Sequence, residues 1–442
     1  MSGGHHAADG GAGAGPGGAD GRQADAGGAT GSGDVTGSGG AKGSGGASGV
    51  RTEPRADRRQ GRATRVLVLN SGSSSVKYQL LDMADGARPA SGVVERIGEE
   101  GGVADHAQAL RRAADDLAAR GLGLDSPELA AIGHRVVHGG TRFTGPTLIT
   151  DDVLAEIEKL VPLAPLHNPA NITGIRVARA LRPDLPQVAV FDTAFHTTIP
   201  EAAARYAIDA ATADRFGIRR YGFHGTSHAF VSRATADLLG RDPADVNVIV
   251  LHLGNGASAS AVRGGVCVDT SMGLTPLEGL VMGTRSGDVD PAVVFHLERV
   301  GGMGTDEIDT LLNKKSGLLG LCGANDMREI GRRMAEDDPR ARLAFDVYVH
   351  RLRRYVGAFT AVLGRVDAIA FTAGVGENSA AVRAAALRDL EGLGIAVDPA
   401  RNAARGSGAR LISPPSGPVA VAVVPTDEEL AIARDTYRLA GG

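Results

Sequence analysis

The chain of 442 residues contains no tryptophan, and aromatic residues make up only 4% of it. Its cores must therefore be built from Ala, Val, Leu and Ile side chains. The two cysteines, Cys267 and Cys322, are too few and too far apart for a disulfide framework or a zinc site with Cys ligands. We expect both to be buried free thiols in a reducing compartment.

Long apolar runs and a strong charge of one sign are also missing. No run reaches the ~18 apolar residues that suggest a membrane span, and the N-terminus has no apolar signal-peptide core. We therefore expect a cytoplasmic protein without membrane contact. The net charge is −4, with both signs spread along the chain, whereas a nucleic-acid-binding protein would carry a basic stripe. The length is sufficient for two or three domains with cores of their own.

Residues 1–63 are rich in Gly, Ala, Ser and Asp and have almost no large apolar side chains. Such a segment cannot bury enough surface to offset the entropy lost on ordering, so we expect a disordered Gly-rich extension. A GxGxxG match at 13–18 has no strand before it and no helix pattern after it. We do not expect it to bind a dinucleotide.

Two strand–turn–strand units are candidates for phosphate-binding loops. In the first, the apolar run 66–69 leads into the hydroxyl-rich turn 70–75 and a returning strand. In the second, the run 248–251 leads into the small-residue turn 253–258 and another extended run. The backbone N–H groups of such turns can face a phosphate. A pair of ordinary hairpins is the alternative, although neither turn has the two-residue Asn-Gly or Asp-Gly form.

Three polar residues stand in positions that favour a binding site. Arg135 lies inside a short apolar strand and needs a partner, which is either an internal carboxylate or an anionic ligand. Asp192 follows the apolar strand 187–191, a common site position in α/β proteins, unless it caps the next helix. Arg285 stands between glycines, from where it can reach charge that develops on a phosphoryl group.

Periodicity predicts the elements around these residues. Residues 316–320 are expected to form a loop. The strand 366–372 should run into Gly374-Val-Gly376 and then a helix, a nucleotide-binding geometry. Thr426, with Glu429 three residues later, predicts a capping box. The long helix expected over 340–363 carries on one face Phe345, Val349, Leu352, Val356 and Phe359.

No GxxxxGK[ST] sequence and no protein-kinase loop signature occurs, which excludes those kinase classes. Asn70-Ser-Gly-Ser-Ser-Ser-Val-Lys77 and the segment from Gly273 to Asp288 instead resemble the two signature segments of the acetokinase family. The resemblance extends from about Arg65 to the end of the chain. It implies an α/β protein with two duplicated domains of the actin/sugar-kinase/Hsp70 (ASKHA) ATPase fold and an interdomain cleft. The domains would be 64–194 plus 430–442, and the nucleotide-binding domain 195–429.

The resemblance also implies an ATP-dependent phosphotransferase with a carboxyl group as acceptor. It would reversibly transfer the γ-phosphoryl group of ATP to acetate, giving acetyl phosphate and ADP, with Mg²⁺ as cofactor and as a homodimer. Propionate is the alternative acceptor within the family. An actin- or Hsp70-like ATPase is a rival from another class, disfavoured because it has no use for two arginines around a carboxylate. A non-catalytic scaffold is disfavoured because every expected site residue is present.

Residue roles follow from the same resemblance. The implied catalytic residues are Asp192, Arg285, His224 and Arg135, and the Mg²⁺ ligands are Asn70 and Glu428. The acetate site would comprise Arg135, Val137, Leu166, His167, Phe223 and Pro276. The nucleotide site would comprise Ser73, Ser75, Lys77, His252, Leu253, Gly254, Asn255, Gly256, Asp326, Met327, Arg328, Gly374, Val375, Gly376, Glu377 and Asn378. Because a carboxylate nucleophile is already ionised at neutral pH, Asp192 is expected to orient its neighbours rather than to move protons.

Overall fold

The structure is a computed structural model and describes residues 63–72 and 74–441. The segment expected to be disordered lies outside the described residues, apart from Ala63, and so does Ser73. Within the described ranges, no helix combines the length and the apolar character that a membrane crossing requires.

The first sheet has six strands in the order β3-β2-β1-β4-β6-β5. β1 pairs antiparallel with β2 and parallel with β4, and β6 extends the parallel part. Successive side chains of β1 point to opposite faces: Leu67 and Leu69 pack toward α1, while Val66 and Val68 pack toward α15. The strands are β1 (Arg65–Ser71), β2 (Ser75–Asp82), β3 (Ala90–Glu95), β4 (Leu129–Val136), β5 (Thr147–Leu148) and β6 (Gln187–Phe191); the helices are α1 (His106–Ala119), α2 (Asp151–Lys159), α3 (Asn168–Leu181) and α15 (Glu428–Leu439).

The second sheet repeats this plan in the order β9-β8-β7-β10-β12-β11. The pattern of antiparallel and parallel pairs is the same as in the first sheet. Val248 and Val250 pack toward α6, and Ile249 and Leu251 toward α11. The strands are β7 (Asn247–Leu253), β8 (Ala257–Arg263), β9 (Val266–Thr270), β10 (Ala368–Thr372), β11 (Arg410–Leu411) and β12 (Ala420–Val423). The duplicated α/β architecture expected from the sequence is confirmed.

The long helix α11 (Pro339–Leu363) buries the apolar face expected from the sequence against the second sheet. The loop expected over 316–320 is wrong: α9 begins at Gly317, because Leu318 and Cys322 are buried in the core that α11 also lines. The remaining helices are α4 (Glu201–Ala204), α5 (Ala210–Phe216), α6 (Gly225–Leu238), α7 (Ala292–Arg299), α8 (Thr305–Lys314), α9 (Gly317–Cys322), α10 (Met327–Ala335), α12 (Ala373–Asn378), α13 (Ala380–Ala386), α14 (Pro399–Ala403) and the 3-10 turns η1 (Val161–Leu163), η2 (Ala194–Thr198), η3 (Pro243–Asp245) and η4 (Glu391–Leu393).

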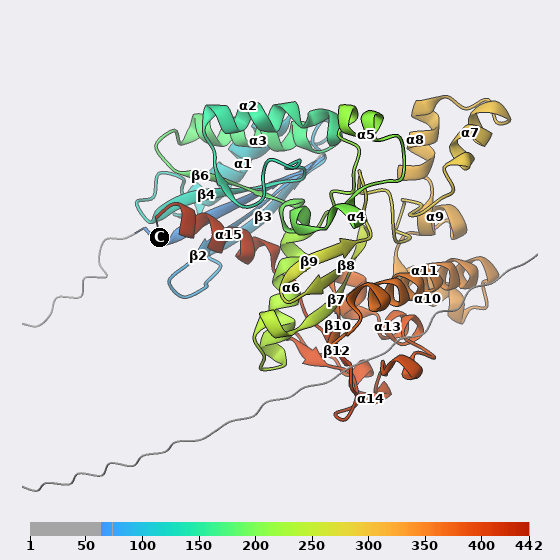
Figure 1. Ribbon diagram of the computed structural model, residues 1–442. Helices are drawn as coiled ribbons and strands as arrows, with labels where there is room; N and C mark the ends of the chain where they lie inside the picture. The colour runs from blue at the N-terminus through green and yellow to red at the C-terminus, as the bar shows by residue number, and fades with distance from the viewer. Residues whose placement is uncertain (1–62, 73, 442) are drawn as a thin grey trace, which may run out of the picture. The chain divides into compact units, whose positions relative to one another are not determined.

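The C-terminal helix α15 leaves the second sheet and packs on the first, against β1, β4 and β6 (Figure 1). Its expected capping box is wrong in detail. Asp427 is the N-cap residue, and its side chain accepts from Leu430 N over 3.1 Å. The Thr426 hydroxyl instead pairs with Ser227 Oγ over 2.8 Å. The glycines of 374–376 likewise lie inside α12 rather than in a loop before a helix.

Candidate active site

Arg135 and Asp192 form a bidentate ion pair at the carboxyl ends of two neighbouring parallel strands. The register sets Arg135 opposite Val190, two positions before Asp192. The guanidinium donates from Nε to Asp192 Oδ1 over 2.9 Å and from Nη2 to Oδ2 over 2.5 Å. Of the two partners left open for Arg135, the structure supplies the internal carboxylate. The capping role considered for Asp192 is wrong, because Thr193 is the N-cap residue of η2.

Two further oxygen atoms approach the same guanidinium. Asn70 Oδ1 lies 3.4 Å from Arg135 Nη1, and Glu428 Oε2, from the first residue of α15, lies 3.8 Å from Arg135 Nε. Burial raises the pKa of Asp192 and of Glu428, and Arg135 opposes both shifts. Burial would lower the pKa of Arg135, but Asp192 and Glu428 raise it. The arginine is therefore charged throughout the physiological range.

These oxygen atoms are the candidate ligands for the Mg²⁺ ion that the family resemblance implies. Among residues 63–72 and 74–441, no cluster of three His, Cys, Asp or Glu side chains could hold a metal ion. A Mg²⁺ ion needs no such cluster, since it commonly keeps several waters and takes one or two carboxylates plus substrate phosphates. The Asn70 carbonyl and the Glu428 carboxylate, both beside one guanidinium, suit that mode of binding.

His224 and Arg285 converge on the turn that follows β7. A methyl group placed on Gly256 would lie 3.1 Å from Arg285 Nη2 and 3.6 Å from His224 Nε2. One point beside this turn is thus within reach of both nitrogen atoms. His224 precedes α6 with a φ of 57°, in the left-handed region that non-glycine residues rarely adopt. Such backbone strain is often stored at functional sites.

Within residues 63–72 and 74–441, Arg285 is held by the backbone rather than by a carboxylate. Its Nη1 donates to Pro276 O over 2.7 Å, and burial lowers its pKa. The backbone N–H of Gly283 donates to Asn255 O over 2.9 Å. The glycine-flanked arginine segment therefore touches the Gly-Asn-Gly turn directly, and its charge is left available for a ligand.

The expected acetate-site residues occupy different surroundings. Phe223 is buried, Val137 and Pro276 are half-buried, and Leu166 is 52% exposed. The Val137 backbone N–H donates to Asn171 Oδ1 over 3.0 Å, which fixes the end of β4. His167 lies in the field of Arg285, Arg135 and Asp192; burial, then the two arginines, lower its pKa.

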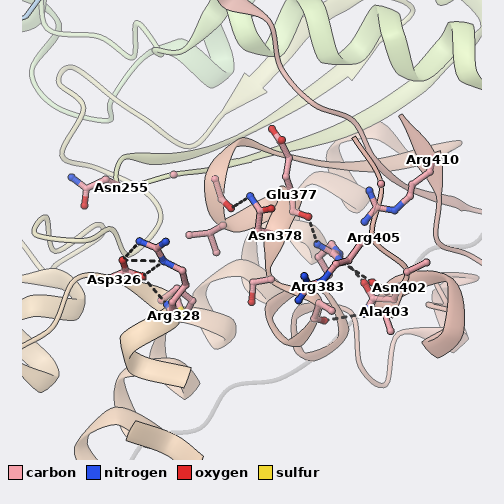
Figure 2. A pocket seen from close by; sticks show the side chains of 18 of the residues that line it. Asn255, Asp326, Arg328, Glu377, Asn378, Arg383, Asn402, Ala403, Arg405 and Arg410 are labelled. Atoms are coloured by element: carbon pink, nitrogen blue, oxygen red, sulfur yellow. Dashed lines mark hydrogen bonds and ion pairs between the residues drawn. The ribbon is translucent and has the colours of Figure 1, made fainter. Parts of the chain in front are cut away.

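A cavity of about 1040 Å³ lies in the second half of the chain (Figure 2). Its walls come from the turn after β7, the start of α10, α12 and the segment between α14 and β11. Nine of the residues expected to bind the nucleotide line it: Gly254, Asn255, Asp326, Met327, Arg328, Gly374, Val375, Glu377 and Asn378.

The other expected nucleotide residues lie around this cavity or elsewhere. His252 and Leu253 are buried in β7, while Gly376 is buried within α12. Ser75 and Lys77 stand on β2, and the register pairs Lys77 with Asn70. Lys77 also lies close enough to lower the pKa of Glu428. Ser73 is outside the described residues.

Sequence reasoning missed one wall of the cavity, formed by Arg383, Arg410 and residues 402–406. Arg383 is buried and donates to Asn402 Oδ1 over 2.7 Å and to the carbonyls of Gly376 and Glu377, each over 2.9 Å. It thereby ties α12 to α14, as Figure 2 shows. Burial, then Arg410, lowers the pKa of Arg383 to about 10. The Arg-rich, Gly-rich stretch 401–410 was the signal available in the sequence.

The profile of the Acetokinase family matches residues 65–434 of the chain. The chain belongs to the acetokinase family. A curated relative, "Acetate kinase" of Streptomyces coelicolor, is 73% identical over 395 residues, which is 85% of this chain and 97% of the relative. "Acetate kinase" of Streptomyces avermitilis is 72% identical over 396 residues, covering 86% of this chain and 98% of the relative.

Two solved structures have the same fold as the chain. The acetate kinase of Porphyromonas gingivalis shares 44% identity with a TM-score of 0.82, over 85% of this chain and all (100%) of that one. A propionate kinase from Francisella tularensis shares 41% identity with a TM-score of 0.80, over 85% of this chain and 99% of that one. Both acceptor types thus occur among structures similar to this acetokinase.

Proposed function

We propose that the protein reversibly transfers the γ-phosphoryl group of ATP to acetate, giving acetyl phosphate and ADP. The observation that carries the proposal is the convergence of Arg285 Nη2 and His224 Nε2 on one point beside Gly256. That point adjoins the turn whose residues Gly254 and Asn255 line the large cavity. A nucleotide in the cavity would direct its terminal phosphate toward these two nitrogen atoms.

The chemistry requires positioning and neutralisation of charge. Acetate would approach with its carboxylate bound by Arg135, already ionised because carboxylic acids titrate near ~4 to 5. No general base is needed, which agrees with an Asp192 carboxylate that accepts both hydrogen bonds from Arg135. Arg285 and His224 would stabilise the metaphosphate-like transition state. Asn70 and Glu428 would hold Mg²⁺, which when bound neutralises charge on the phosphate oxygens.

The nucleotide would lie along the cavity wall. In this proposal Asp326, Met327 and Arg328 at the start of α10 and Gly374–Asn378 of α12 contact its nucleoside part. His252–Gly256 and the β2 residues Ser75 and Lys77 belong to the phosphate side, together with Ser73. The two halves, 64–194 with 430–442 and 195–429, would act as domains that close on the nucleotide.

A direct test is trapping of the product. With ATP, Mg²⁺, acetate and hydroxylamine, the protein should form acetyl hydroxamate in proportion to ADP released. Hydrolysis of ATP without hydroxamate would refute the proposal and would support an actin- or Hsp70-like ATPase.

Propionate is the second candidate acceptor, favoured by the likeness to the Francisella propionate kinase. Val137, Leu166, Phe223 and Pro276 would line the acyl pocket. One extra methylene changes the transition-state binding free energy in such a pocket by only ~1–3 kcal/mol. Relative kcat/KM values for acetate, propionate and butyrate therefore decide which acceptor the protein prefers. We place acetate first because the relatives at 73% and 72% identity are acetate kinases.

The proposal includes a cytoplasmic homodimer. Both cysteines are buried free thiols, as expected in a reducing compartment. Helix α7 buries none of its residues, while Phe295 is 50% and Val300 73% exposed. A second copy of the chain would cover these side chains. Light scattering should give twice the chain mass, and Phe295→Glu should shift the protein toward the monomer.

A further inference from the structure

Three buried or half-buried side chains form a hydrogen-bonded chain behind the point where Arg285 and His224 converge. Ser258, on β8, lies between two imidazoles of the α6 region. Its Oγ is 2.9 Å from His224 Nδ1 and 2.7 Å from His228 Nε2. Ser258 and His228 are each 0% exposed. Water therefore does not compete for these hydrogen bonds.

Ser258 has one hydroxyl hydrogen and two acceptor lone pairs, and among residues 63–72 and 74–441 its Oγ hydrogen-bonds the two imidazoles alone. Because the buried hydroxyl hydrogen needs an acceptor, one imidazole must accept from Ser258 and the other must donate to it, which leaves two arrangements. Either the hydroxyl donates to His224 and accepts from His228, or the reverse. The other nitrogen of His228 decides between them. His228 Nδ1 is buried and has no hydrogen-bond partner among residues 63–72 and 74–441. An orphaned buried N–H group is rarer than an under-satisfied acceptor.

His228 therefore carries its hydrogen on Nε2 and donates it to Ser258 Oγ. The hydroxyl then donates to His224 Nδ1, which must be the unprotonated nitrogen. The hydrogen of a neutral His224 stands on Nε2, the atom that faces the point beside Gly256.

We propose that Ser258 and His228 are positioning residues that fix His224 as the Nε2–H tautomer, so that an uncharged His224 donates a hydrogen bond to the transferring phosphoryl group. This inference rests on the proposed function for the identity of the acceptor. The tautomer itself follows from the hydrogen-bond chain alone.

The surroundings of His224 keep its imidazole neutral, so the neutral form is the one that contacts the phosphoryl group. The charged or titratable groups that face it are Arg135 of β4, His252 of β7, His228 of α6 and Arg285 of the loop after β9. Burial, followed by these groups, lowers the pKa of His224 well below its usual value. The His252 ring stacks on it, with centroids 4.3 Å apart and planes 18° apart. A neutral imidazole has one N–H group, so catalysis depends on which nitrogen holds it.

The first test reads the tautomer directly. The full chain labelled with ¹⁵N-histidine, with His224 assigned by comparison with His224→Gln, should show a protonated Nε2 and a bare Nδ1 from about pH 6 to 8. A proton on Nδ1 in the wild type would overturn the inference. This spectrum needs no turnover, so it remains informative if acetyl hydroxamate is never formed and the proposed function fails.

The second test perturbs the chain. Ser258→Ala should mix the two tautomers and lower kcat about 10- to 100-fold, as removal of an orienting partner typically does. KM for ATP and acetate should change by less than about threefold, since the contact acts in the transition state. Ser258→Thr keeps the hydroxyl and should restore both the tautomer and most of kcat.

Ser260→Ala is the matched control. Ser260 is two residues along the same strand and is fully buried. Its Oγ lies 2.9 Å from Thr270 Oγ1 and also hydrogen-bonds the Cys267 thiol, while Thr270 Oγ1 donates to Ala259 O. It should leave the His224 tautomer and kcat unchanged. Equal losses of kcat in the Ser258 and Ser260 variants, with the tautomer intact, would show a structural role only and overturn the proposal.

Discussion

The Arg135–Asp192 pair permits a quantitative prediction, because the chain contains a second bidentate pair whose carboxylate is exposed rather than buried. Asp192→Asn removes the charge from a carboxylate that is 1% exposed and accepts two hydrogen bonds from Arg135. Breaking a buried ion pair by removing one partner costs ~3–5 kcal/mol. The amide keeps one oxygen acceptor, and Glu428 remains 3.8 Å from Arg135 Nε. We therefore expect a loss of about 3 kcal/mol in the free energy of unfolding, at the lower end of that range.

The matched control is Asp184→Asn. Arg182 also makes a bidentate contact, with Nε 2.8 Å from Asp184 Oδ1 and Nη2 2.7 Å from Oδ2, but the Asp184 side chain is 64% exposed. Solvent screens such pairs, and their contribution is ~0–1 kcal/mol. Urea denaturation of the two variants and the wild type therefore separates the effect of carboxylate burial on the free energy of unfolding from the effect of bidentate geometry. Equal stability losses in both variants would refute the reasoning.

The same variant tests the role of Asp192 in turnover. If Asp192 holds Arg135 in place, kcat/KM for acetate should fall about 100-fold, equivalent to ~2.7 kcal/mol, with the pH profile unmoved. Initial rates of hydroxamate formation from about pH 6 to 8 measure this. Retained acetate and metal affinity, combined with lost turnover and a shifted pH profile, would show instead that Asp192 transfers protons.

Two further predictions follow from glycine and histidine positions. Gly256→Ala should lower kcat about 100-fold, as loss of one transition-state donor does, because the added methyl group would lie 3.1 Å from Arg285 Nη2 and displace it. Gly331→Ala is the control and should leave hydroxamate formation unchanged, because a methyl group added there would have no atom within 4 Å. Burial lowers the pKa of His134, His196 and His252 to about 4, whereas the unfolded chain titrates near ~6.5. The unfolded state then binds more protons between these values, so stability falls as pH drops from about 6.5 toward 4, by up to ~1.4 kcal/mol per histidine per pH unit. A urea midpoint equal at pH 7.5 and 5.5 would contradict this.

The sequence contains enough local signal to predict the elements on which the site is built. Both strand–turn–strand units were visible because their apolar runs and small-residue turns are contiguous, and the structure places them at equivalent positions of two sheets. The buried face of α11 was equally readable from its periodicity. Arg135 and Asp192 were each identified, but their pairing depends on β4 and β6 being neighbours, which no local pattern states.

Other features could not be predicted because long-range packing decides them. The local sequence of α9 predicts a loop. The segment is helical because Leu318 and Cys322 pack into the core beside α11. Thr426 has the sequence of a helix cap, yet its hydroxyl is occupied by Ser227 from 199 residues away. Arg383 belongs to no local motif, and Ser258 stands in the small-residue turn 253–258 without any sign of its histidine partners. Their importance arises only from the groups that tertiary structure brings within hydrogen-bonding distance.

The path of α15 has a consequence for how the chain is made. Ile432 and Ala433 of this last helix bury Val66 and Val68 of the first strand, and Glu428 at its start stands beside Arg135. During synthesis from the N-terminus, that face of the first sheet stays uncovered until the residues of α15 have been made. The second sheet has all its strands earlier and can complete its core first. Nascent chains that end before residue 428 should therefore expose the first half to chaperones and proteases, whatever the state of the second.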